Sequence, residues 1–414
     1  MILEMYLKQN NLNIRKMHLL TQIPEATLRN INKRPIAKWN MKYFDALAEI
    51  LNKDKIEVIK ELEILEKDLI QFNEDEVLFG KFDLENRRYI GSKSKLTSWI
   101  VDLISEHTSG DTFFDVFAGT AVITKAMLEK CSIFHINDFL YSNEVIYEAF
   151  FGNEKIDKNK LCTLEEEFQN LKANNLENNY FSDNFGSKFF SMNDSKLIGE
   201  IREKIELMKD LNKREKSILI SSLILSADKV ANTVGHYDAY RKNVRILDKF
   251  VFNLITPIDT RDKEIHIHRE DSNFLVRNVE ADIAFVDPPY NSRQYSRFYH
   301  VLENLTKWEK PELSGVAMKP EAENMSDYCK VSAPEVFDDL IKNLKCRYIV
   351  VTYNNTYESK SSSSKNKITH DEILTTLNSV GRTRVFEKSH QFFNAGKTVL
   401  EGHKEFVFIT KVGG

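Results

Sequence analysis

Cysteine, glycine and proline are all scarce in this sequence of 414 residues, and no long apolar run is present. The four cysteines are scattered without a CxxC pair, so neither a disulfide framework nor a zinc site is expected, and a reducing cytosol is the expected compartment. No apolar stretch approaches the ~18 residues that span a bilayer, so we expect no membrane partner. The first residues also lack the basic start and apolar run of a signal peptide.

The net charge of −4 excludes a basic field over the whole chain. The charge is unevenly distributed, however. Residues 1–44 carry eight Lys or Arg against two Glu, whereas residues 45–80 carry four basic and eleven acidic side chains. A basic segment followed by an acidic helix favours a small DNA-binding module, although charge blocks are also common on solvated faces.

The N-terminal segment reads as helical, with short helices predicted over residues 13–20, 25–32 and 43–51. Residues 19–30 resemble the helix-turn-helix of phage-repressor-type regulators, with Gln22 at the position that usually holds a turn glycine. The resemblance implies that the second helix enters the major groove of DNA. A helical dimerisation or docking domain is the alternative. The residues expected near DNA are Glu25, Thr27, Arg29 and Asn30.

The most informative stretch is Asp287-Pro288-Pro289-Tyr290, which follows an apolar run at residues 283–286 that predicts a buried strand. Neither proline has an N–H, so the two carbonyl groups project without competing amides. Such a ledge suits an exocyclic amine, because a carboxylate and a carbonyl can accept its two protons while the tyrosine ring stacks on the base. A tight turn with a stacked tyrosine is the alternative.

A second group of features predicts a doubly wound α/β sheet. Residues 112–117 read as a strand, 118–121 as a turn of small residues and 122–130 as a helix, followed by another strand at 133–136. Asp138 comes directly after that strand, where an acid can accept hydrogen bonds from ribose hydroxyls. A helix N-cap is an equally good interpretation of Asp138.

The order of these pieces resembles the Dam-like class of DNA adenine-N6 methyltransferases. The likeness covers about residues 88–412 and depends on a small set of motifs, separated by a long insert. They are Tyr-Ile-Gly-Ser-Lys at 89–93, Asp-Val-Phe-Ala-Gly-Thr at 115–120, Asp138, Asp-Pro-Pro-Tyr at 287–290, Tyr-Asn-Asn at 353–355 and Lys-Glu-Phe-Val-Phe at 404–408.

The resemblance implies a Rossmann-like methyltransferase domain whose cofactor part covers residues 81–149 and whose catalytic part covers 263–414. Between them, an inserted target-recognition region is expected at 150–262. Residues 1–80 would form the separate all-α helix-turn-helix domain. Ala121 stands where the family commonly has a second glycine, so its methyl group is expected to crowd the cofactor.

The same resemblance implies S-adenosyl-L-methionine as the cofactor, with Lys93 directed toward its methionine carboxylate and Asp138 toward its ribose. No metal is predicted, because His266 and His268 on a probable strand have no apparent third ligand. The implied cofactor contacts are Tyr89, Lys93, Asp115, Phe117, Gly119, Asp138 and Asp271. The implied catalytic residues are Asp287, Pro288, Pro289 and Tyr290.

Two polar and aromatic segments are candidates for contact with duplex DNA. Residues 232–242 mix amides, aromatics and basic side chains, which suits contacts to base edges and phosphates, and residues 291–300 could close over an extruded base. Ordinary polar loops are the alternative for both. The residues predicted to bind DNA here are Asn232, His236, Tyr237, Arg241, Arg293 and Tyr295.

These observations predict a cytoplasmic, nucleoid-associated enzyme that methylates adenine N6 in duplex DNA after the base has flipped out of the stack. A restriction–modification context is expected, with a possible cognate restriction endonuclease as partner. One alternative is a methyltransferase acting on RNA or on a protein amide. Another is a DNA-binding regulator with an inactive methyltransferase body, against which the intact ledge at Asp287 argues.

Overall fold

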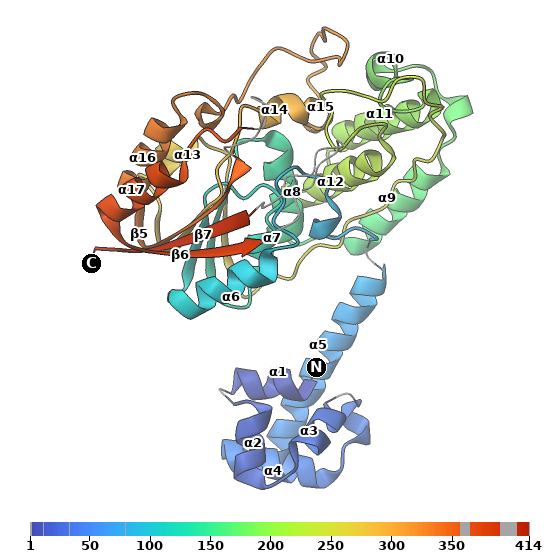
Figure 1. The fold of residues 1–414 in the computed structure, drawn as a ribbon. Helices are drawn as coiled ribbons and strands as arrows, with labels where there is room; N and C mark the ends of the chain where they lie inside the picture. The colour runs from blue at the N-terminus through green and yellow to red at the C-terminus, as the bar shows by residue number, and fades with distance from the viewer. Residues whose placement is uncertain are drawn as a thin grey trace. The chain divides into compact units, whose positions relative to one another are not determined.

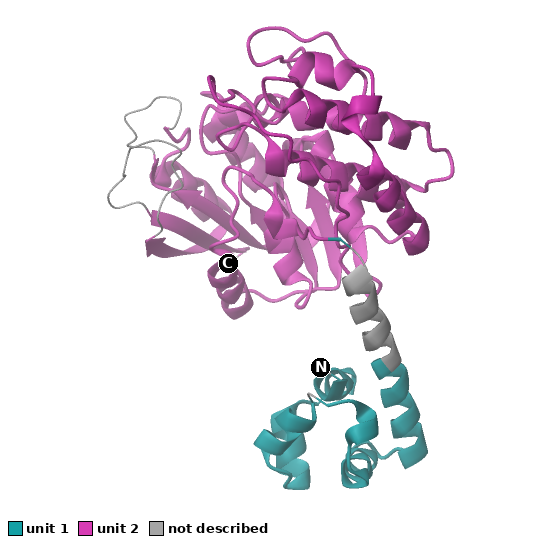
Figure 2. Ribbon diagram, turned by 90° about the vertical axis from the view of Figure 1, so that its right-hand side faces the viewer, with its two compact units in different colours: residues 1–80 teal, residues 81–414 magenta. Residues whose placement is uncertain are grey.

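The chain forms two compact units, residues 1–80 and residues 81–414, in a computed structural model (Figure 2). The structure describes all residues except 1, 11, 33, 79, 357–364, 390–403 and 414, and it leaves the side chains of 67–78 undescribed. None of the helices in this described part is both long enough and apolar enough to cross a membrane.

The first unit is a bundle of helices around a small apolar core. Leu3, Met17, Leu28 and Leu47 are fully buried in it. The first helix was not predicted from the sequence, and the last falls within residues 45–80, which were read as an acidic helix. The other three lie within two residues of the predicted bounds. The elements are α1 (Ile2–Gln9), α2 (Ile14–Thr21), α3 (Glu25–Ile31), η1 (Ile36–Lys38), α4 (Met41–Leu51) and α5 (Lys55–Leu78).

The turn between α2 and α3 depends on a residue in the left-handed region. Gln22 has φ 59° and ψ 11°, and its N–H donates to the carbonyl of His18. Asn13 caps the start of α2 by accepting from the Lys16 N–H at 2.8 Å. A non-glycine residue pays about 1–2 kcal/mol for this conformation. Gln22 therefore supplies the sharp turn without the usual glycine, while the DNA-binding role of these helices stays a prediction.

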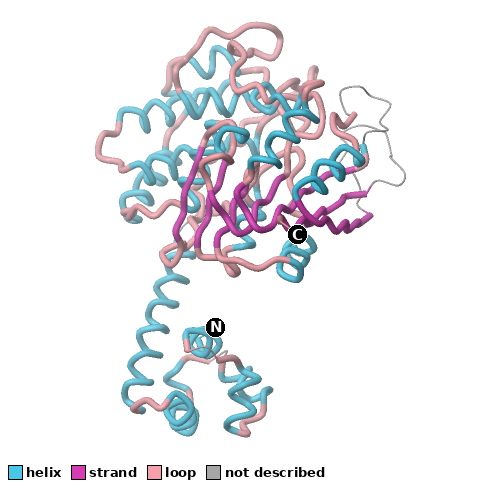
Figure 3. The backbone as a smooth tube through the Cα atoms, turned by 90° about the vertical axis from the view of Figure 1, so that its left-hand side faces the viewer, coloured by secondary structure: helices cyan, strands magenta, loops and turns pink. Residues whose placement is uncertain are grey.

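The second unit is built on a seven-stranded sheet of order β3-β2-β1-β4-β5-β7-β6 (Figures 1 and 3). The first five of these strands are parallel to their neighbours, and β7 runs antiparallel between β5 and β6. The predicted α/β sheet is confirmed. The strands are β1 (Thr112–Asp115), β2 (Ile133–Asn137), β3 (Glu264–His268), β4 (Glu280–Val286), β5 (Lys345–Asn354), β6 (Gly381–Ser389) and β7 (Lys404–Val412).

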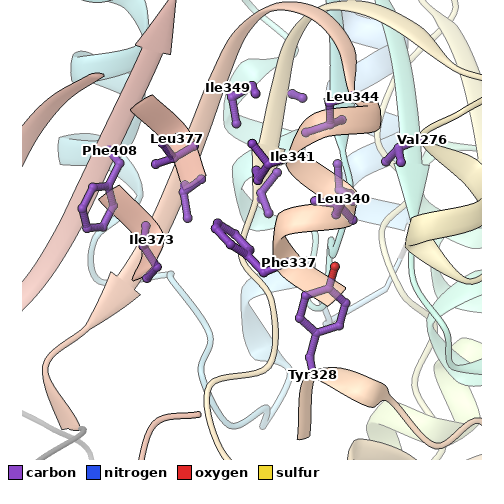
Figure 4. Packing of buried hydrophobic residues seen from close by; sticks show 14 of the residues in the cluster. Val276, Tyr328, Phe337, Leu340, Ile341, Leu344, Ile349, Ile373, Leu377 and Phe408 are labelled. Carbon is purple, nitrogen blue, oxygen red and sulfur yellow. The ribbon is translucent and has the colours of Figure 1, made fainter. Parts of the chain in front are cut away.

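The central strands are apolar on both faces because helices cover both sides of the sheet. Phe114 and Val286 belong to a core shared with Phe337 and Leu377 of two covering helices (Figure 4). The alternate residue Phe113, also fully buried, points to the opposite face. The remaining helices around the sheet are η2 (Leu84–Asn86), α6 (Thr97–His107), α7 (Val122–Met127), α13 (Ser272–Leu275), α14 (Tyr295–Phe298), α15 (His300–Lys307), η4 (Asp327–Cys329), α16 (Ala333–Asn343) and α17 (His370–Val380).

A helical segment lies between β2 and β3 in the sequence. It ends in residues 231–263, which the structure shows with neither helix nor strand. Its helix α12 packs against α8 and α15. The elements are α8 (Tyr141–Phe151), α9 (Lys158–Asn170), η3 (Ala173–Asn175), α10 (Tyr180–Phe185), α11 (Met192–Leu207) and α12 (Lys213–Val230).

Candidate active site

A cavity of about 940 Å³, counted to its open mouth, lies at the carboxyl ends of β1, β2, β3 and β4. This is the edge at which parallel α/β sheets bind ligands, and the volume is in the usual range for a small-molecule site. All seven residues that were predicted to contact a cofactor line it: Tyr89, Lys93, Asp115, Phe117, Gly119, Asp138 and Asp271. Asp287, Pro289 and Tyr295 also line it.

The turn after β1 is held tightly around Gly119, which has φ +53°. Its N–H donates to Asp138 Oδ2 at 3.0 Å, and its carbonyl accepts from Arg87 at 2.9 Å and Tyr147 at 2.8 Å. A Cβ on this residue would come within 3.3 Å of the Tyr89 ring. A glycine is therefore needed here for both the backbone conformation and the close approach.

Ala121 departs from the family pattern in a different way than expected. Its φ is +56°, in the left-handed region, and it is fully buried. It is not among the residues that line the cavity, unlike its neighbours Thr120 and Val122. The expected crowding of the cofactor is therefore wrong, and the missing glycine instead imposes backbone strain.

Asp115 is a buried carboxyl with an unused acceptor in the cavity wall. Its Oδ2 accepts from Thr124 Oγ1 at 2.6 Å, while Oδ1 is buried with no hydrogen-bond partner. Burial raises the pKa of Asp115 to about 7, although the hydrogen bond from Thr124 opposes this rise. A bound cation or hydrogen-bond donor would satisfy Oδ1.

Asp138 is oriented by its own loop. Its Oδ1 accepts from the N–H of Leu140 at 3.0 Å, and Oδ2 accepts from Gly119. Burial raises its pKa, while these hydrogen bonds act in the opposite direction. The next helix, α8, begins at Tyr141 with Leu140 as its N-cap residue, so the N-cap interpretation of Asp138 is wrong.

The two carboxylate oxygens of Asp287 differ in their hydrogen-bond partners. Oδ1 lies 2.9 Å from Lys93 Nζ, accepts from Thr352 Oγ1 at 2.7 Å, and also accepts from the Tyr290 hydroxyl. Oδ2 has no hydrogen-bond partner among the described residues. The carboxylate is thus fixed on one side and free to accept a hydrogen bond on the other.

Lys93 lies at the centre of this cluster rather than at its edge. Its Nζ is 2.6 Å from the Tyr290 hydroxyl and 3.2 Å from Glu405 Oε1, and its side chain is only 6% exposed. Burial alone would lower the pKa of Lys93, but the carboxylates of Asp287 and Glu405 outweigh it and raise the pKa. The structure thus pairs Lys93 with protein carboxylates, and its predicted contact with the methionine carboxylate stays a prediction.

Tyr290 is held from two sides. Its ring centroid lies 4.5 Å from that of Tyr353, and its carbonyl accepts from the Lys367 N–H at 2.8 Å. Burial, followed by the charge of Asp287, raises the pKa of its hydroxyl. Stacking of Tyr290 on a base stays a prediction, as this ring packs on Tyr353 here.

Three tyrosines connect the segment at 89–93 to the loop after the ledge. The Tyr89 ring stacks on Tyr299 with centroids 4.9 Å apart and on Tyr295 at 5.3 Å. The Tyr295 hydroxyl donates to the carbonyl of Ile90 at 3.1 Å, and the Tyr299 hydroxyl accepts from the N–H of Ile90 at 2.8 Å. Tyr295, predicted as a DNA contact, therefore forms part of the cavity wall.

The predicted DNA contacts at 232–242 divide into internal and exposed residues. Tyr237 is fully buried and donates to Asp228 Oδ1 at 2.8 Å, so its prediction as a DNA contact is wrong for this structure. Asn232 uses its Nδ2 to hold the carbonyls of Lys188 and Arg241, each at 2.9 Å. These two residues support the loop from within.

Two further predicted contacts, His236 and Arg293, lie against Phe298. The His236 ring stacks on it at 4.5 Å, and the Arg293 guanidinium lies 5.9 Å from its centroid. Both are half-buried. The exposed basic side chains lie just beyond, in the irregular segment 241–249. They are Arg241, Lys242, Arg245 and Lys249, and none forms an ion pair with another described residue.

In the N-terminal unit, Arg29 and Asn30 are exposed and Thr27 is half-buried. Arg29 lies 3.5 Å from Glu25 and 4.0 Å from Glu4. The side chains are 61% (Arg29), 48% (Glu4) and 36% (Glu25) exposed, so these ion pairs contribute little and leave Arg29 available to another anion.

Several residues of the cavity and cluster were not predicted from the sequence. Thr352 and Glu405 lie in or beside motifs that carry the family resemblance, but no role was predicted for either residue. Asn324, Ser326 and Tyr328 line the cavity from η4 and the loop just before it, a stretch that has no sequence signal. The Nδ2 of Asn324 is buried without a partner, so it is a further donor available to a ligand.

The histidines near the edge strand form a stack rather than a chelating group. His135 on β2 stacks on His266 with centroids 4.6 Å apart and lies 3.1 Å from His268 Nε2 through its Nδ1. Across the described residues, no group of His, Cys, Asp or Glu has an arrangement that could hold a metal ion.

Comparison with known proteins identifies the family. The family model described as D12 class N6 adenine-specific DNA methyltransferase matches residues 89–406. This chain belongs to that family. The match runs from the cavity-lining segment at 89–93 into β7, and it confirms the predicted resemblance to adenine-N6 methyltransferases.

Individual relatives carry names of the same kind. The chain is 33% identical over 287 residues to Modification methylase StsI of Streptococcus sanguinis, a match that covers 65% of this chain and 44% of that protein. It is 31% identical over 318 residues to Type II methyltransferase M.CviAII of Paramecium bursaria Chlorella virus 1, covering 74% and 92%. It is 27% identical over 327 residues to Type II methyltransferase M.NlaIII of Neisseria lactamica, covering 76% and 95%.

The chain spans less than half the length of the StsI methylase, and likewise 46% of Modification methylase LlaI of Lactococcus lactis. It covers nearly the whole of the two Type II methyltransferases. Residues 1–88 lie outside the family match.

Proposed function

We propose that this chain is a site-specific DNA methyltransferase that transfers a methyl group from S-adenosyl-L-methionine to N6 of an adenine flipped out of duplex DNA. The observation that carries the proposal is the asymmetric carboxylate of Asp287 at the wall of the cavity. Three donors fix its Oδ1, and its Oδ2 has no partner among the described residues. Family membership supports the same reaction.

The residues present fit the cofactor. The free Oδ1 of Asp115 would accept from the ammonium group, and Asp138 would accept from the ribose hydroxyls. Tyr89, Phe117, Gly119 and Asp271 would line the same ligand, since all of them lie on the cavity wall. When bound, S-adenosylmethionine supplies a sulfonium methyl group that is already strongly electrophilic.

The protein's task is to position a weak nucleophile. The lone pair of adenine N6 is delocalised into the ring, so the amine attacks well only when its hydrogens are held out of the ring plane. Asp287 Oδ2 and the carbonyl of Pro288 would accept those two hydrogens, which directs the lone pair toward the methyl group. Transfer is then a direct displacement without a covalent enzyme intermediate.

The target base has to leave the helix, because an amine inside a duplex cannot reach the Asp287 carboxylate. We assign contacts with the DNA phosphates to the exposed basic segment 241–249, whose four basic side chains form no ion pair with other described residues. His236 and Arg293 would contact the DNA near the segment 287–290, and Tyr290 would stack on the extruded base.

The N-terminal unit would add a second DNA contact through Thr27, Arg29 and Asn30, or would bind the operator of the protein's own operon. The names of the relatives, modification methylases and Type II methyltransferases, support a restriction–modification role with a cognate endonuclease. Deleting residues 1–75 separates the two roles of the unit. Unchanged DNA affinity and methylation rate would rule out a part in substrate binding.

The substrate class is tested by incubating the full chain with labelled S-adenosylmethionine and, in parallel, unmodified genomic DNA, RNA or protein. We expect label in DNA alone, recovered as N6-methyladenine after digestion to nucleosides. Label found only in RNA or only in protein would show that this molecule, and not DNA, is the substrate. DNA binding without transfer would point to a regulator with an inactive body.

A further inference from the structure

The C-terminal strand β7 contributes a carboxylate to the cluster that holds Asp287. Glu405 lies on this strand, is 4% exposed, and has its Oε1 3.2 Å from Lys93 Nζ and 3.2 Å from the Tyr290 hydroxyl. It is separated from Asp287 by more than one hundred residues in sequence. No part of the reaction described above uses it.

A buried carboxylate is costly unless it is paired, because removing a charge from water is unfavourable. One carboxylate would suffice to balance the single ammonium of Lys93. The cluster instead contains two carboxylates, Asp287 and Glu405, and is therefore anionic when both are ionised.

The excess negative charge lies beside the atom at which positive charge develops. Methyl transfer from a sulfonium to a neutral amine forms the N6–methyl bond, breaks the sulfur–methyl bond and moves the positive charge onto N6. The charge is then lost as a proton from N6, which Asp287 Oδ2 accepts and passes to water. A second anion near Asp287 favours both the transition state and this loss.

We propose that Glu405 is a positioning residue for methyl transfer. It shares Lys93 and Tyr290 with Asp287 and keeps both of these donors beside Oδ1 of Asp287. It also adds a negative charge that stabilises the cationic N6. This inference rests on the proposed function. Lys93 and Tyr290 connect the two carboxylates directly, so Glu405 acts on the amine through them without touching it.

The first test is Glu405→Gln, which keeps an oxygen acceptor for Lys93 and removes the charge. In the full chain acting on unmodified genomic DNA, we expect the single-turnover rate of methyl transfer to fall about 10- to 50-fold, as expected for one charge a few ångströms away. The KM for S-adenosylmethionine and the melting temperature should stay close to those of the parent. Glu387→Gln on the neighbouring strand β6, an exposed partner of Lys404, is the matched control and should change nothing.

The pH dependence of the methyl-transfer rate distinguishes the effect of the Glu405 charge from that of its shape. Burial raises the pKa of Glu405, with the charge of Asp287 acting in the same direction and Lys93 opposing it. The acid limb of the parent's rate should therefore report ionisation of Glu405, and it should move to lower pH in Glu405→Gln. Among the described residues, Lys93, Asp287 and Tyr290 act on Glu405 directly, and Lys388 lies opposite it on β6. A Gln variant with the parent's rate and profile overturns the inference while leaving the proposed function intact.

Two further measurements cover other outcomes. If Glu405→Gln fails to fold, the methyl-transfer rates of Glu405→Asp and Glu405→Asn are compared, because these two side chains have nearly the same size and differ in charge. Equal rates for the two variants would overturn the inference. If the parent methylates no DNA, the proposed function fails, and the charge coupling is read from the carboxyl titration of Glu405 by carbon-13 NMR. That titration should move to lower pH in Asp287→Asn; no movement overturns the inference.

Discussion

Replacing Thr352 by valine tests whether the fixed side of Asp287 matters. Thr352 is fully buried on β5, and its hydroxyl donates to Asp287 Oδ1 at 2.7 Å. Valine has the same shape and lacks the donor, so the change removes one of three bonds on this oxygen without creating a cavity. Asp287 would then be held by Lys93 and Tyr290 alone.

The size of the effect follows from the chemistry of the bond. A hydrogen bond to a charged group contributes about 1.5–3 kcal/mol. If that amount is lost from the transition state, the rate falls about 10- to 100-fold, because about 1.4 kcal/mol corresponds to a factor of ten. Two donors remain on Oδ1, so we expect a result near tenfold.

The assay is single-turnover methyl transfer to unmodified DNA, with cofactor affinity measured separately by titration. Thr352→Val should slow the transfer step and leave the dissociation constant for S-adenosylmethionine unchanged, because Thr352 does not line the cavity. Thr352→Ser keeps the hydroxyl and should retain most of the rate. A Val variant as fast as the parent, with the Ser variant no faster, would refute the idea that orientation of Oδ1 limits transfer.

Three other outcomes are expected. Ala121→Gly should raise the free energy of unfolding by up to about 1 kcal/mol in a denaturant titration, because it relieves a left-handed alanine, and it should leave cofactor affinity unchanged; tighter binding would restore the crowding hypothesis. Burial raises the pKa of Asp115 to about 7, so its stabilising contribution is complete below about pH 4 and is lost as the pH rises through 7. Asp115→Asn should therefore flatten the unfolding free energy measured between pH 4 and pH 8, and a slope equal to the parent's would contradict this. Lys242→Gln should reduce the slope of log affinity for DNA against log salt concentration by about one, and an unchanged slope would remove Lys242 from the phosphate contacts.

The centre of the sheet was predictable from the sequence because β1, β2 and β4 are short apolar runs followed directly by polar motifs. The run at 283–286 and the turn at 118–121 locate β4 and the end of β1, and parallel strands bring their carboxyl ends to one edge. All seven residues expected to contact a cofactor consequently line one cavity.

The cluster around Asp287 was not predictable in the same way. Thr352 and Glu405 come from two later strands, and the pairing of β4 with β5 and of β5 with β7 brings them beside Asp287. An apolar pattern indicates that such strands are buried but does not indicate which polar residue on them faces a distant motif. Local sequence also failed for Tyr237, because a polar aromatic segment gives no sign that this one ring points inward to Asp228.

The central claim is that Asp287 receives the amine of an extruded adenine, and the amount of N6-methyladenine formed in DNA measures it most directly. The parent chain and Asp287→Ala are incubated with S-adenosylmethionine and unmodified genomic DNA, and the digested nucleosides are quantified by mass spectrometry once both proteins are shown to be folded. We predict that N6-methyladenine accumulates with the parent and falls to background with Asp287→Ala. Equal amounts from the two proteins would contradict the claim.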